Sequence, residues 1–144
     1  MPITAIACGD VHTLAVRANG EVWSWGRGAN GRLGHGSTSD VFTPRNIEYF
    51  AETGRRMIDV AAGKNFSLAL SDGGEVFAWG NGEDGQLGSP VKESVHPKLV
   101  EKLKNYRIGT ISAGDVYICA RTLTSEDLRE DWNLPVYPWT HESE

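Results

Sequence analysis

One stretch of sequence occurs twice in this chain and constrains the fold more than any other feature. Residues 20–34 read GEVWSWGRGANGRLG, and residues 74–88, which lie 54 positions later, read GEVFAWGNGEDGQLG. At this offset, 13 of the 32 positions from 5 to 36 are identical. A third, partial copy begins at Ile111 and runs through Arg121. A repeat of this length predicts stacked similar units, because one unit cannot bury its apolar face alone.

The repeat contains the string G-R-G-A-N-G, which has the glycine spacing of a dinucleotide-binding loop. Such a loop needs a strand before it and a helix opening on its last glycine, so that free N–H groups face the phosphates. The residues after Gly31 are too rich in glycine and hydroxyl side chains for a first helical turn. In the second copy, Glu83 and Asp84 would face the phosphates and repel them. We therefore interpret the glycines as turn residues and expect no cofactor.

Between the glycines, the sequence alternates in the manner of short strands joined by tight hairpins. In the second repeat we expect strands at 56–62, 66–71 and 75–80, followed by a long loop and an outer strand near Pro97. In the first repeat the outer strand lies near Pro44. Four short antiparallel strands per repeat describe a propeller blade. The prediction is an all-β, partial β-propeller of four-stranded antiparallel blades with a short helical and extended C-terminal tail.

The proposed boundaries follow the repeats. Propeller blades occupy residues 1–121, as repeat 1 at about 3–55, repeat 2 at about 56–107 and a half repeat at 108–121. An acidic, aromatic tail follows at 122–144. A hydroxyl cap and acidic residues indicate a short helix from Thr124 to Glu130, whereas two prolines keep residues 132–139 extended. We favour a tail that folds back on the open propeller edge over one that docks on a partner as an extended peptide.

Several motifs together resemble the regulator of chromosome condensation repeat family. They are G-x-x-H-T-L-A-V at 9–16, the string at 20–36, a proline at 44 and I-D-V-A-A-G at 58–63. The resemblance covers roughly residues 3–121 and implies a seven-bladed propeller as the full family fold. This chain holds two such blades and the first two strands of a third.

The repeated tryptophans are the expected anchors between blades, because each indole can bury about 200 Å². The predicted structural anchors are Trp25, Trp79, Gly26, Gly80, Leu33 and Leu87. His12 has the apolar Phe66 at its equivalent position in the second repeat, which indicates a packed histidine. The plant ultraviolet-B receptor resembles this fold and uses clustered tryptophans as its chromophore, but its G-W-R-H-T segment does not occur in this chain.

The charge and the cysteine content limit the possible binding partners and the cellular compartment. The chain carries 14 Lys and Arg against 19 Asp and Glu, and the acidic excess lies in the tail. Without a basic cluster, we expect neither nucleic acid nor a membrane as partner. Cys8 and Cys119 lie far apart in apolar surroundings, which indicates buried free thiols in a reducing compartment, cytoplasmic or nuclear.

Residue patterns for chemistry are sparse. None of the four histidines has a second ligand at metal-site spacing, and no nucleophile stands beside an evident base, so we expect no catalytic, metal or cofactor residues and no enzyme activity. The leading hypothesis is a non-enzymatic protein-interaction or scaffold module, part of a larger assembly or oligomer. The candidate partner contacts are Arg27, Arg32, His35, Trp132, Tyr137 and Trp139.

Two other functions remain open at this stage. The family resemblance implies an alternative as a guanine nucleotide exchange factor-like regulator of a small GTPase, and a second as a fragment of an ultraviolet-B receptor-like propeller.

An incomplete ring also leaves apolar faces uncovered. We expect these at Ile3, Ile6, Val11 and Leu14, and at Ile111, Val116, Tyr117 and Ile118. Such faces predict self-association or completion of a ring with another subunit.

Overall fold

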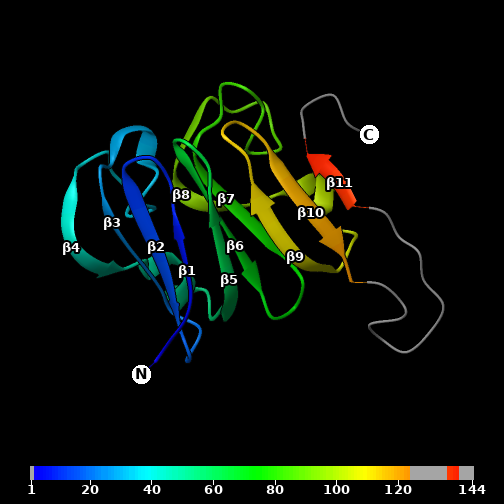
Figure 1. Cartoon of the computed structure of the whole chain (residues 1–144), viewed down its shortest axis with the longest axis horizontal. Coiled ribbons are helices and arrows are strands. Elements are labelled where there is room, and N and C mark those ends of the chain that lie inside the picture. Colours follow the sequence, from blue (N-terminus) through cyan, green and yellow to red (C-terminus); the bar gives the residue numbers. More distant parts are fainter. Residues whose placement is uncertain (1, 124–135, 140–144) are drawn as a thin grey trace.

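The computed structural model describes residues 2–123 and 136–139, the last four by their backbone alone. Three antiparallel sheets follow one another along the chain and lie side by side (Figure 1). Blade 1, at the left of Figure 1, has the strand order β1-β2-β3-β4. Its strands are β1 (Ile3–Cys8), β2 (His12–Arg17), β3 (Val22–Gly26) and β4 (Val41–Asn46).

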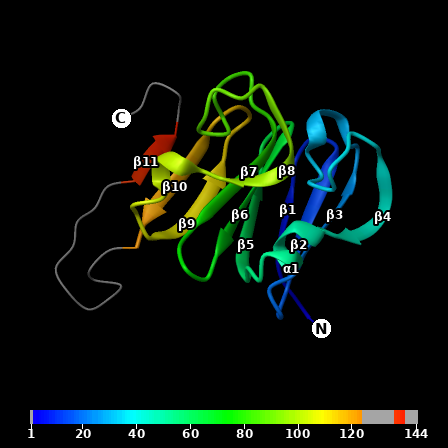
Figure 2. The ribbon, with the colours of Figure 1, turned by 180° about the vertical axis from the view of Figure 1, so that it is seen from behind.

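Blade 2 repeats this topology in the order β5-β6-β7-β8. Its strands are β5 (Met57–Ala62), β6 (Phe66–Ser71), β7 (Val76–Asn81) and β8 (Glu93–Leu99). The short helix α1 (Glu48–Glu52), visible in Figure 2, connects the outer strand of blade 1 to the inner strand of blade 2. Two single turns, η1 (Ala29–Gly31) and η2 (Glu101–Leu103), lie in the connections. The predicted all-β, four-stranded blades are therefore confirmed.

Blade 3 has three strands, one more than the sequence predicts. They are β9 (Ile108–Ala113), β10 (Ile118–Thr122) and β11 (Val136–Trp139), in the order β11-β10-β9. The tail thus returns to the sheet and pairs antiparallel with β10, which agrees with the favoured interpretation of the tail. The helix expected at 124–130 lies outside the described residues.

The register shows that β11 takes the position of a regular blade strand. Trp25 of β3 pairs with Thr13, and Trp79 of β7 pairs with Ser67. Trp139 of β11 pairs with Ile118. Ile118 is equivalent to Ser67, because Ile118 pairs with Ala113 on its other side and Ser67 pairs with Ala62. The three strands VWSW, VFAW and VYPW therefore occupy equivalent positions in three consecutive blades.

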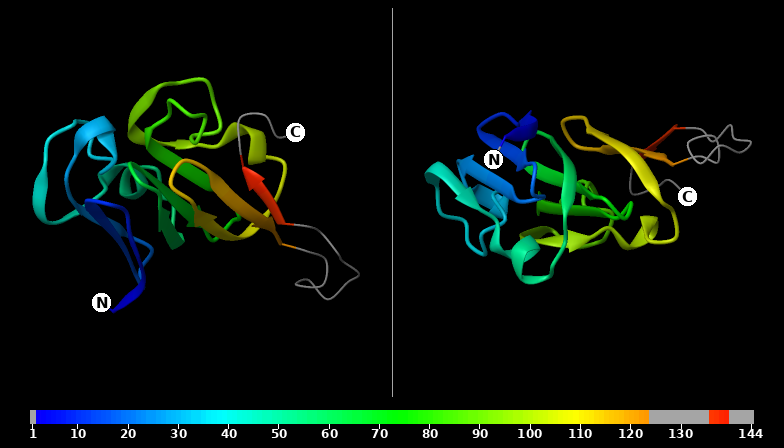
Figure 3. Two further views of the ribbon diagram at one scale, coloured as in Figure 1. Left: turned by 45° about the horizontal axis from the view of Figure 1, so that its top comes forward. Right: turned by 90° about the horizontal axis from the view of Figure 1, so that it is seen from below.

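The core consists of two layers between blades. We call the side of a blade that packs on the preceding blade its front face, and the opposite side its back face. Between blades 1 and 2, one cluster joins back-face and linker residues to front-face residues: Leu14, Val16, Val22, Ile47 and Phe50 with Met57, Val60, Ala69, Phe77 and Trp79. The second cluster joins Leu68, Leu70, Val76 and Ala78 to Ile108, Ile118 and Ala120. Figure 3 shows blade 2 between its two neighbours.

Two residues expected on uncovered faces are instead buried in these layers. Leu14 and Ile118 are both fully buried, because their side chains point toward blade 2 from opposite sides. Ile3, Ile6, Val11, Val116 and Tyr117 are exposed, as expected. The uncovered apolar surface is therefore smaller than the sequence suggests. It lies on β1, at Ile3 and Ile6, and in the hairpin loops that precede β2 and β10.

A steric constraint explains why glycine follows the tryptophan in both repeats. Gly26 and Gly80 adopt φ angles of 118° and 109°, which residues with a side chain rarely adopt. A Cβ on Gly26 would lie 2.5 Å from the carbonyl oxygen of Val11, and one on Gly80 would lie 2.8 Å from that of Asn65. The backbone of β3 or β7 thus passes directly against the preceding hairpin. The interpretation of these glycines as turn and close-approach residues is confirmed.

Candidate interaction surfaces

The loop after β3 is fixed to both blades by two buried serines. Ser24 Oγ, on β3 of blade 1, donates to the carbonyl oxygen of Leu33 at 2.7 Å. Ser67 Oγ, on β6 of blade 2, donates to the carbonyl oxygen of Arg32 at 2.7 Å. Both serines have no exposed surface. Adjacent residues of one loop are therefore held by two different blades, which makes this loop a rigid part of the junction.

Each serine also contacts a histidine, and the proton positions follow from this arrangement. His12 Nε2 lies 2.9 Å from Ser67 Oγ, and His35 Nε2 lies 2.9 Å from Ser24 Oγ. Because each hydroxyl gives its only hydrogen to a carbonyl, it accepts from the histidine. Both imidazoles therefore carry their proton on Nε2. The other nitrogen of His12, Nδ1, is buried without a hydrogen-bond partner.

Burial keeps both histidines neutral. Desolvation lowers the pKa of His12 to about 4, helped by the positive charge of Arg32 and opposed by the Phe66 backbone and Asp10. Desolvation also lowers the pKa of His35, with Arg45 acting in the same direction and Ser24 and Glu48 acting against it. The expectation that His12 is a packed histidine is consistent with its 3% exposure.

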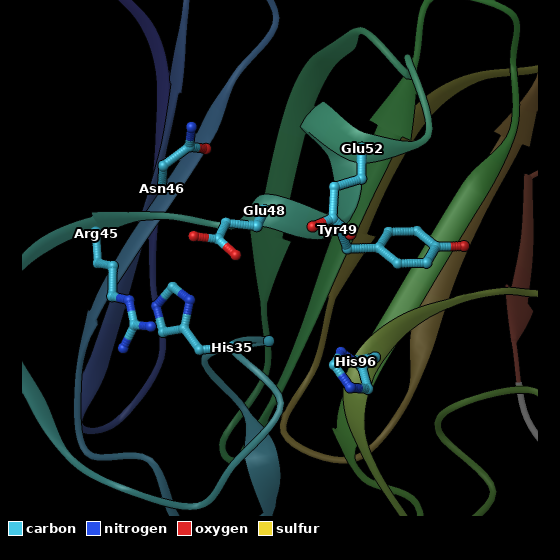
Figure 4. Close-up of a pocket in the computed structure, with 8 residues that line it drawn as sticks. His35, Arg45, Asn46, Glu48, Tyr49, Glu52 and His96 are labelled. Carbon is cyan, nitrogen blue, oxygen red and sulfur yellow. The ribbon is translucent and has the colours of Figure 1, made fainter.

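A pocket of about 400 Å³ opens where this loop meets α1 and β8 (Figure 4). Its polar lining comes from both blades: His35, Arg45, Asn46, Glu48, Tyr49, Glu52 and His96, and Gly34 also lines it. In Figure 4 the guanidinium of Arg45 lies beside the His35 ring, and Glu48 extends toward the same pair. His96 faces them from the other side. The pocket therefore combines acidic, basic and aromatic groups on a rigid support.

A second, wider hollow of about 880 Å³ lies between the 82–92 loop and η2. Half of its lining residues are glycine, serine or proline, and the other half are charged: Glu83, Asp84, Lys92, Glu101 and Lys102. Lys104 and Glu101 form an exposed ion pair at 3.3 Å beside it. Within this loop Asp84 N donates to the side chain of the buried Gln86 at 2.8 Å, whereas the buried Ser89 Oγ has no hydrogen-bond partner among the described residues.

The candidate partner contacts of the first repeat lie in different environments. Arg27 is exposed, pairs with Asp40 at 3.5 Å and lies 6.0 Å from the ring centre of Phe42. Phe42 itself is 69% exposed. Arg32, by contrast, is only 8% exposed and donates to Ala29 O and Asn30 Oδ1 within its own loop. Arg32 is thus a structural residue, contrary to the expectation from sequence.

The predicted anchors divide in a similar way. Trp79, Leu33 and Leu87 are buried. Trp25 is only half-buried, because it lies on the front face of blade 1, where no preceding blade covers it. The two tryptophans therefore occupy equivalent positions in the repeat but differ in burial.

The remaining expectations concern the tail and the cysteines. Trp132 lies outside the described residues, and of Tyr137 and Trp139 the structure describes only the backbone, in β11. Both cysteines are free, but Cys8 is exposed and Cys119 half-buried. The prediction of buried thiols was wrong, because each cysteine lies on a blade face that has no neighbour in this chain.

Among the described residues, no group of three or more His, Cys, Asp and Glu side chains is placed to hold a metal ion. None of the described helices is long and apolar enough to cross a membrane.

Comparison with known families now identifies the repeat. The profile of the regulator of chromosome condensation (RCC1) repeat matches residues 19–70 and 73–120, and a second profile of the same repeat matches 3–32 and 57–86. The chain belongs to the RCC1 repeat family. It is an RCC1-repeat propeller module, as the resemblance in the sequence indicated.

Among its relatives, the mouse E3 ubiquitin-protein ligase HERC2 is 40% identical over 88% of this chain, and the Arabidopsis thaliana ultraviolet-B receptor UVR8 is 38% identical over 95%. This chain spans 3% of the first protein and 30% of the second. Human WBSCR16 aligns with 96% of the chain at a TM-score of 0.81 and 25% identity, and Prp20p of Saccharomyces cerevisiae with 94% at 0.71 and 30%. The chain spans 33% and 31% of these two solved chains.

Proposed function

We propose that this RCC1-repeat module works as a non-enzymatic protein-interaction scaffold. The observation that carries the proposal is the loop held between Ser24 and Ser67, which builds a rigid, mixed-charge pocket across two blades. Binding residues commonly lie on loops that a rigid scaffold positions. RCC1 repeats are not catalytic in themselves, and we extend this to the present chain. A cytoplasmic or nuclear location remains a prediction.

The pocket suits a protein surface that carries a charged side chain. Glu48 extends toward Arg45 and the neutral His35, and Glu52 also lines the pocket. A partner can therefore place a basic group against the carboxylates while a polar group reaches Arg45. The exposed Arg27–Asp40 pair and Phe42 extend the contact surface along the same loop and β4. Aromatic and arginine side chains are enriched at protein interfaces.

Affinity capture with charge-reversed variants tests this surface. The full chain and the double variant Glu48→Lys/Glu52→Lys are used as baits in extract of the source cells, and bound proteins are quantified by mass spectrometry. The control Glu83→Lys reverses a charge in the wider hollow. We expect one set of proteins to bind the parent and the control and to be lost from the double variant. An unchanged set on the double variant would contradict the pocket as the binding surface.

The alternative as an exchange factor for a small GTPase is favoured by one comparison. The solved structure of Prp20p is described with its binding to Gsp1p and histones, and that protein is 30% identical to this chain. Release of a fluorescent guanine nucleotide from Gsp1 in the presence of the full chain tests this function. Acceleration of release would favour the exchange-factor function, and an unchanged rate would reject it. Because this chain spans 31% of Prp20p, the scaffold remains our first proposal.

The second alternative, a fragment of an ultraviolet-B receptor-like propeller, rests on the 38% identity to UVR8. In this chain Trp79 packs edge-on against Phe50 at 5.8 Å, inside the layer between blades 1 and 2. That contact explains Trp79 as a packing residue. Illumination at the indole absorption band, followed by measurement of the oligomeric state, distinguishes a light-responsive fragment from the scaffold.

A further inference from the structure

Four residues that line the pocket at α1 carry hydrogen-bond acceptors without a partner. His35 carries its proton on Nε2 and donates it to Ser24, so its Nδ1 is an acceptor. Asn46 has a buried Oδ1 that no described residue reaches with a hydrogen bond. The carboxylates of Glu48 and Glu52 form no hydrogen bond or ion pair within the described part of the chain. A ligand that fits this pocket therefore brings several hydrogen-bond donors.

The charge of the lining favours a cation. Two carboxylates, those of Glu48 and Glu52, stand against one guanidinium, that of Arg45, while the lowered pKa of His35 leaves its ring uncharged. In Figure 4 Glu48 extends toward Arg45, yet Arg45 forms no ion pair with either carboxylate among the described residues. A cationic group that enters the pocket thus meets carboxylates that no side chain of this chain neutralises.

Two aromatic rings in the lining are held in place by blade 2. Tyr49 packs edge-on against Phe77, with 6.2 Å between the ring centres. The His96 ring lies against the loop backbone, since a Cβ on Gly36 would be 2.8 Å from its Cε1. Gly36 N also donates to the carbonyl oxygen of Val95 on β8 at 3.0 Å. The pocket is therefore largely preformed, which lowers the entropy cost of binding.

A guanidinium suits these groups better than an ammonium. Its N–H donors lie in one plane and reach acceptors in different directions, and its flat face stacks on aromatic rings. Here the acceptors come from a loop, at His35, and from α1, at Glu48 and Glu52, and the rings of Tyr49 and His96 line the same pocket (Figure 4). A lysine ammonium is a compact point charge without a flat face. The combination of separate acceptors and rings therefore favours arginine.

The wider hollow at the next junction shows which of these groups are particular to the pocket. The backbone pairing of the two linkers aligns Glu101 with Glu48, and the next residue, Lys102, takes the place of the tyrosine ring. At the 54-residue offset, Ser89 takes the position of His35. The hollow therefore has one of the same carboxylates, but it has neither the imidazole acceptor nor the aromatic ring.

We propose that the pocket at α1 binds an arginine side chain, whose guanidinium donates to Glu48, Glu52 and Nδ1 of His35. Arg45 then donates to an acceptor beside that arginine, such as a backbone carbonyl of the same segment. This inference rests on the proposed scaffold function, because it names the group by which the pocket recognises a protein partner.

Peptide titration of the full chain tests the inference. A glycine pentapeptide with a central arginine is added to the isotope-labelled chain up to about 10 mM, a range in which NMR detects weak binding. Matched peptides carry citrulline, which has the same shape with a neutral urea, or lysine. We expect shifts at His35 and at residues 48–52 with the arginine peptide. Binding of the citrulline peptide should be at least about tenfold weaker, because hydrogen bonds between neutral groups and carboxylates are weaker than charge-assisted ones.

A pair of variants locates the binding. Glu48→Gln/Glu52→Gln keeps the size of both side chains and removes their charge, so we expect at least about tenfold weaker binding of the arginine peptide. Glu101→Gln makes the same change in the wider hollow and should bind like the parent. The peptide comparison on the parent chain does not depend on the folding of these variants. Equal binding of the arginine and citrulline peptides, or no shift at the pocket, would overturn the inference.

The capture experiment with Glu48→Lys/Glu52→Lys answers a separate question. Loss of captured proteins from that variant, together with no binding of the arginine peptide, would keep the pocket as a binding surface and overturn the assignment of arginine. Arginine-specific binding at the pocket, together with an unchanged set of captured proteins, would support the arginine site and contradict the pocket as the scaffold surface.

Discussion

Ser67 Oγ, on the second blade, donates a 2.7 Å hydrogen bond to the carbonyl oxygen of Arg32, in the loop of the first blade. The same oxygen lies 2.9 Å from His12 Nε2. One hydroxyl therefore connects a strand of blade 2 to a loop and a strand of blade 1. This contact fixes the loop that forms part of the pocket to both blades.

Removal of this hydroxyl should destabilise the junction. In Ser67→Ala, the carbonyl of Arg32 and the Nε2–H of His12 lose their buried partner, so we expect a loss of about 1–3 kcal/mol in the free energy of unfolding. Urea denaturation followed by circular dichroism measures it. Ser37→Ala, in the exposed part of the same loop, should stay near the parent value. Equal midpoints for all three proteins would show that the junction does not depend on Ser67.

Acid should destabilise the protein through His12. Its pKa is about 4 in the folded state against 6.5 in the unfolded chain, so below pH 6.5 the unfolded state binds the proton more readily. The contribution of His12 to the free energy of unfolding is therefore constant above pH 6.5. It falls as the pH approaches 4, by about 3 kcal/mol at about 1.4 kcal/mol per pKa unit.

The control for this pH effect is His12→Phe, which copies Phe66 of blade 2. Its unfolding free energy should fall less between pH 6.5 and pH 4, and the slope that remains includes His35, whose pKa is also lowered. Parallel pH profiles for the parent and the variant would contradict a neutral, buried His12.

The two repeated tryptophans should differ in their contribution to stability. Trp79 has no exposed surface, so Trp79→Ala should cost about 3–5 kcal/mol, as for other buried aromatic side chains. Trp25 is half-buried on the open front face, and its replacement should cost clearly less, about 1–2 kcal/mol, because less apolar area leaves water on folding. Denaturant midpoints compare them. Equal losses would mean that something covers Trp25 in solution.

The repeat in the sequence predicts most of the strands of this fold, and particular residues explain why one strand was not predicted. The strand 66–71 is found at the predicted residues, and 56–62 and 75–80 shift by one residue, because glycine turns bound them. The third copy of the V-x-x-W strand was missed. In the first two blades a short turn precedes this strand, whereas residues 123–135 separate β10 from β11, so a fixed offset does not align it. Pro138 also made the segment look unlike a strand.

The interaction surfaces were harder to predict, for a physical reason. Equivalent residues such as Trp25 and Trp79, or Cys8 and Ala62, have the same local pattern, and only the presence of a neighbouring blade decides whether they are buried. Arg32 was predicted to contact a partner because it lies in a polar loop of the first blade. Arg32 is buried because the loop folds back on itself and the carbonyl oxygen of Ala29 accepts a hydrogen bond from Arg32 Nε. The order of residues in the sequence does not reveal this conformation.

Hydrogen exchange at residues 118–122 and 136–139 tests the three-blade architecture most directly. In the register of β11, the N–H groups of Tyr137 and Trp139 point toward β10, as those of Trp23 and Trp25 point toward β2. We predict slow exchange at Tyr137 and Trp139, and faster exchange along β10 in a chain that ends at residue 123. Exchange of residues 136–139 at the rate of a free peptide, with β10 unchanged by the truncation, would contradict a third blade completed by the tail.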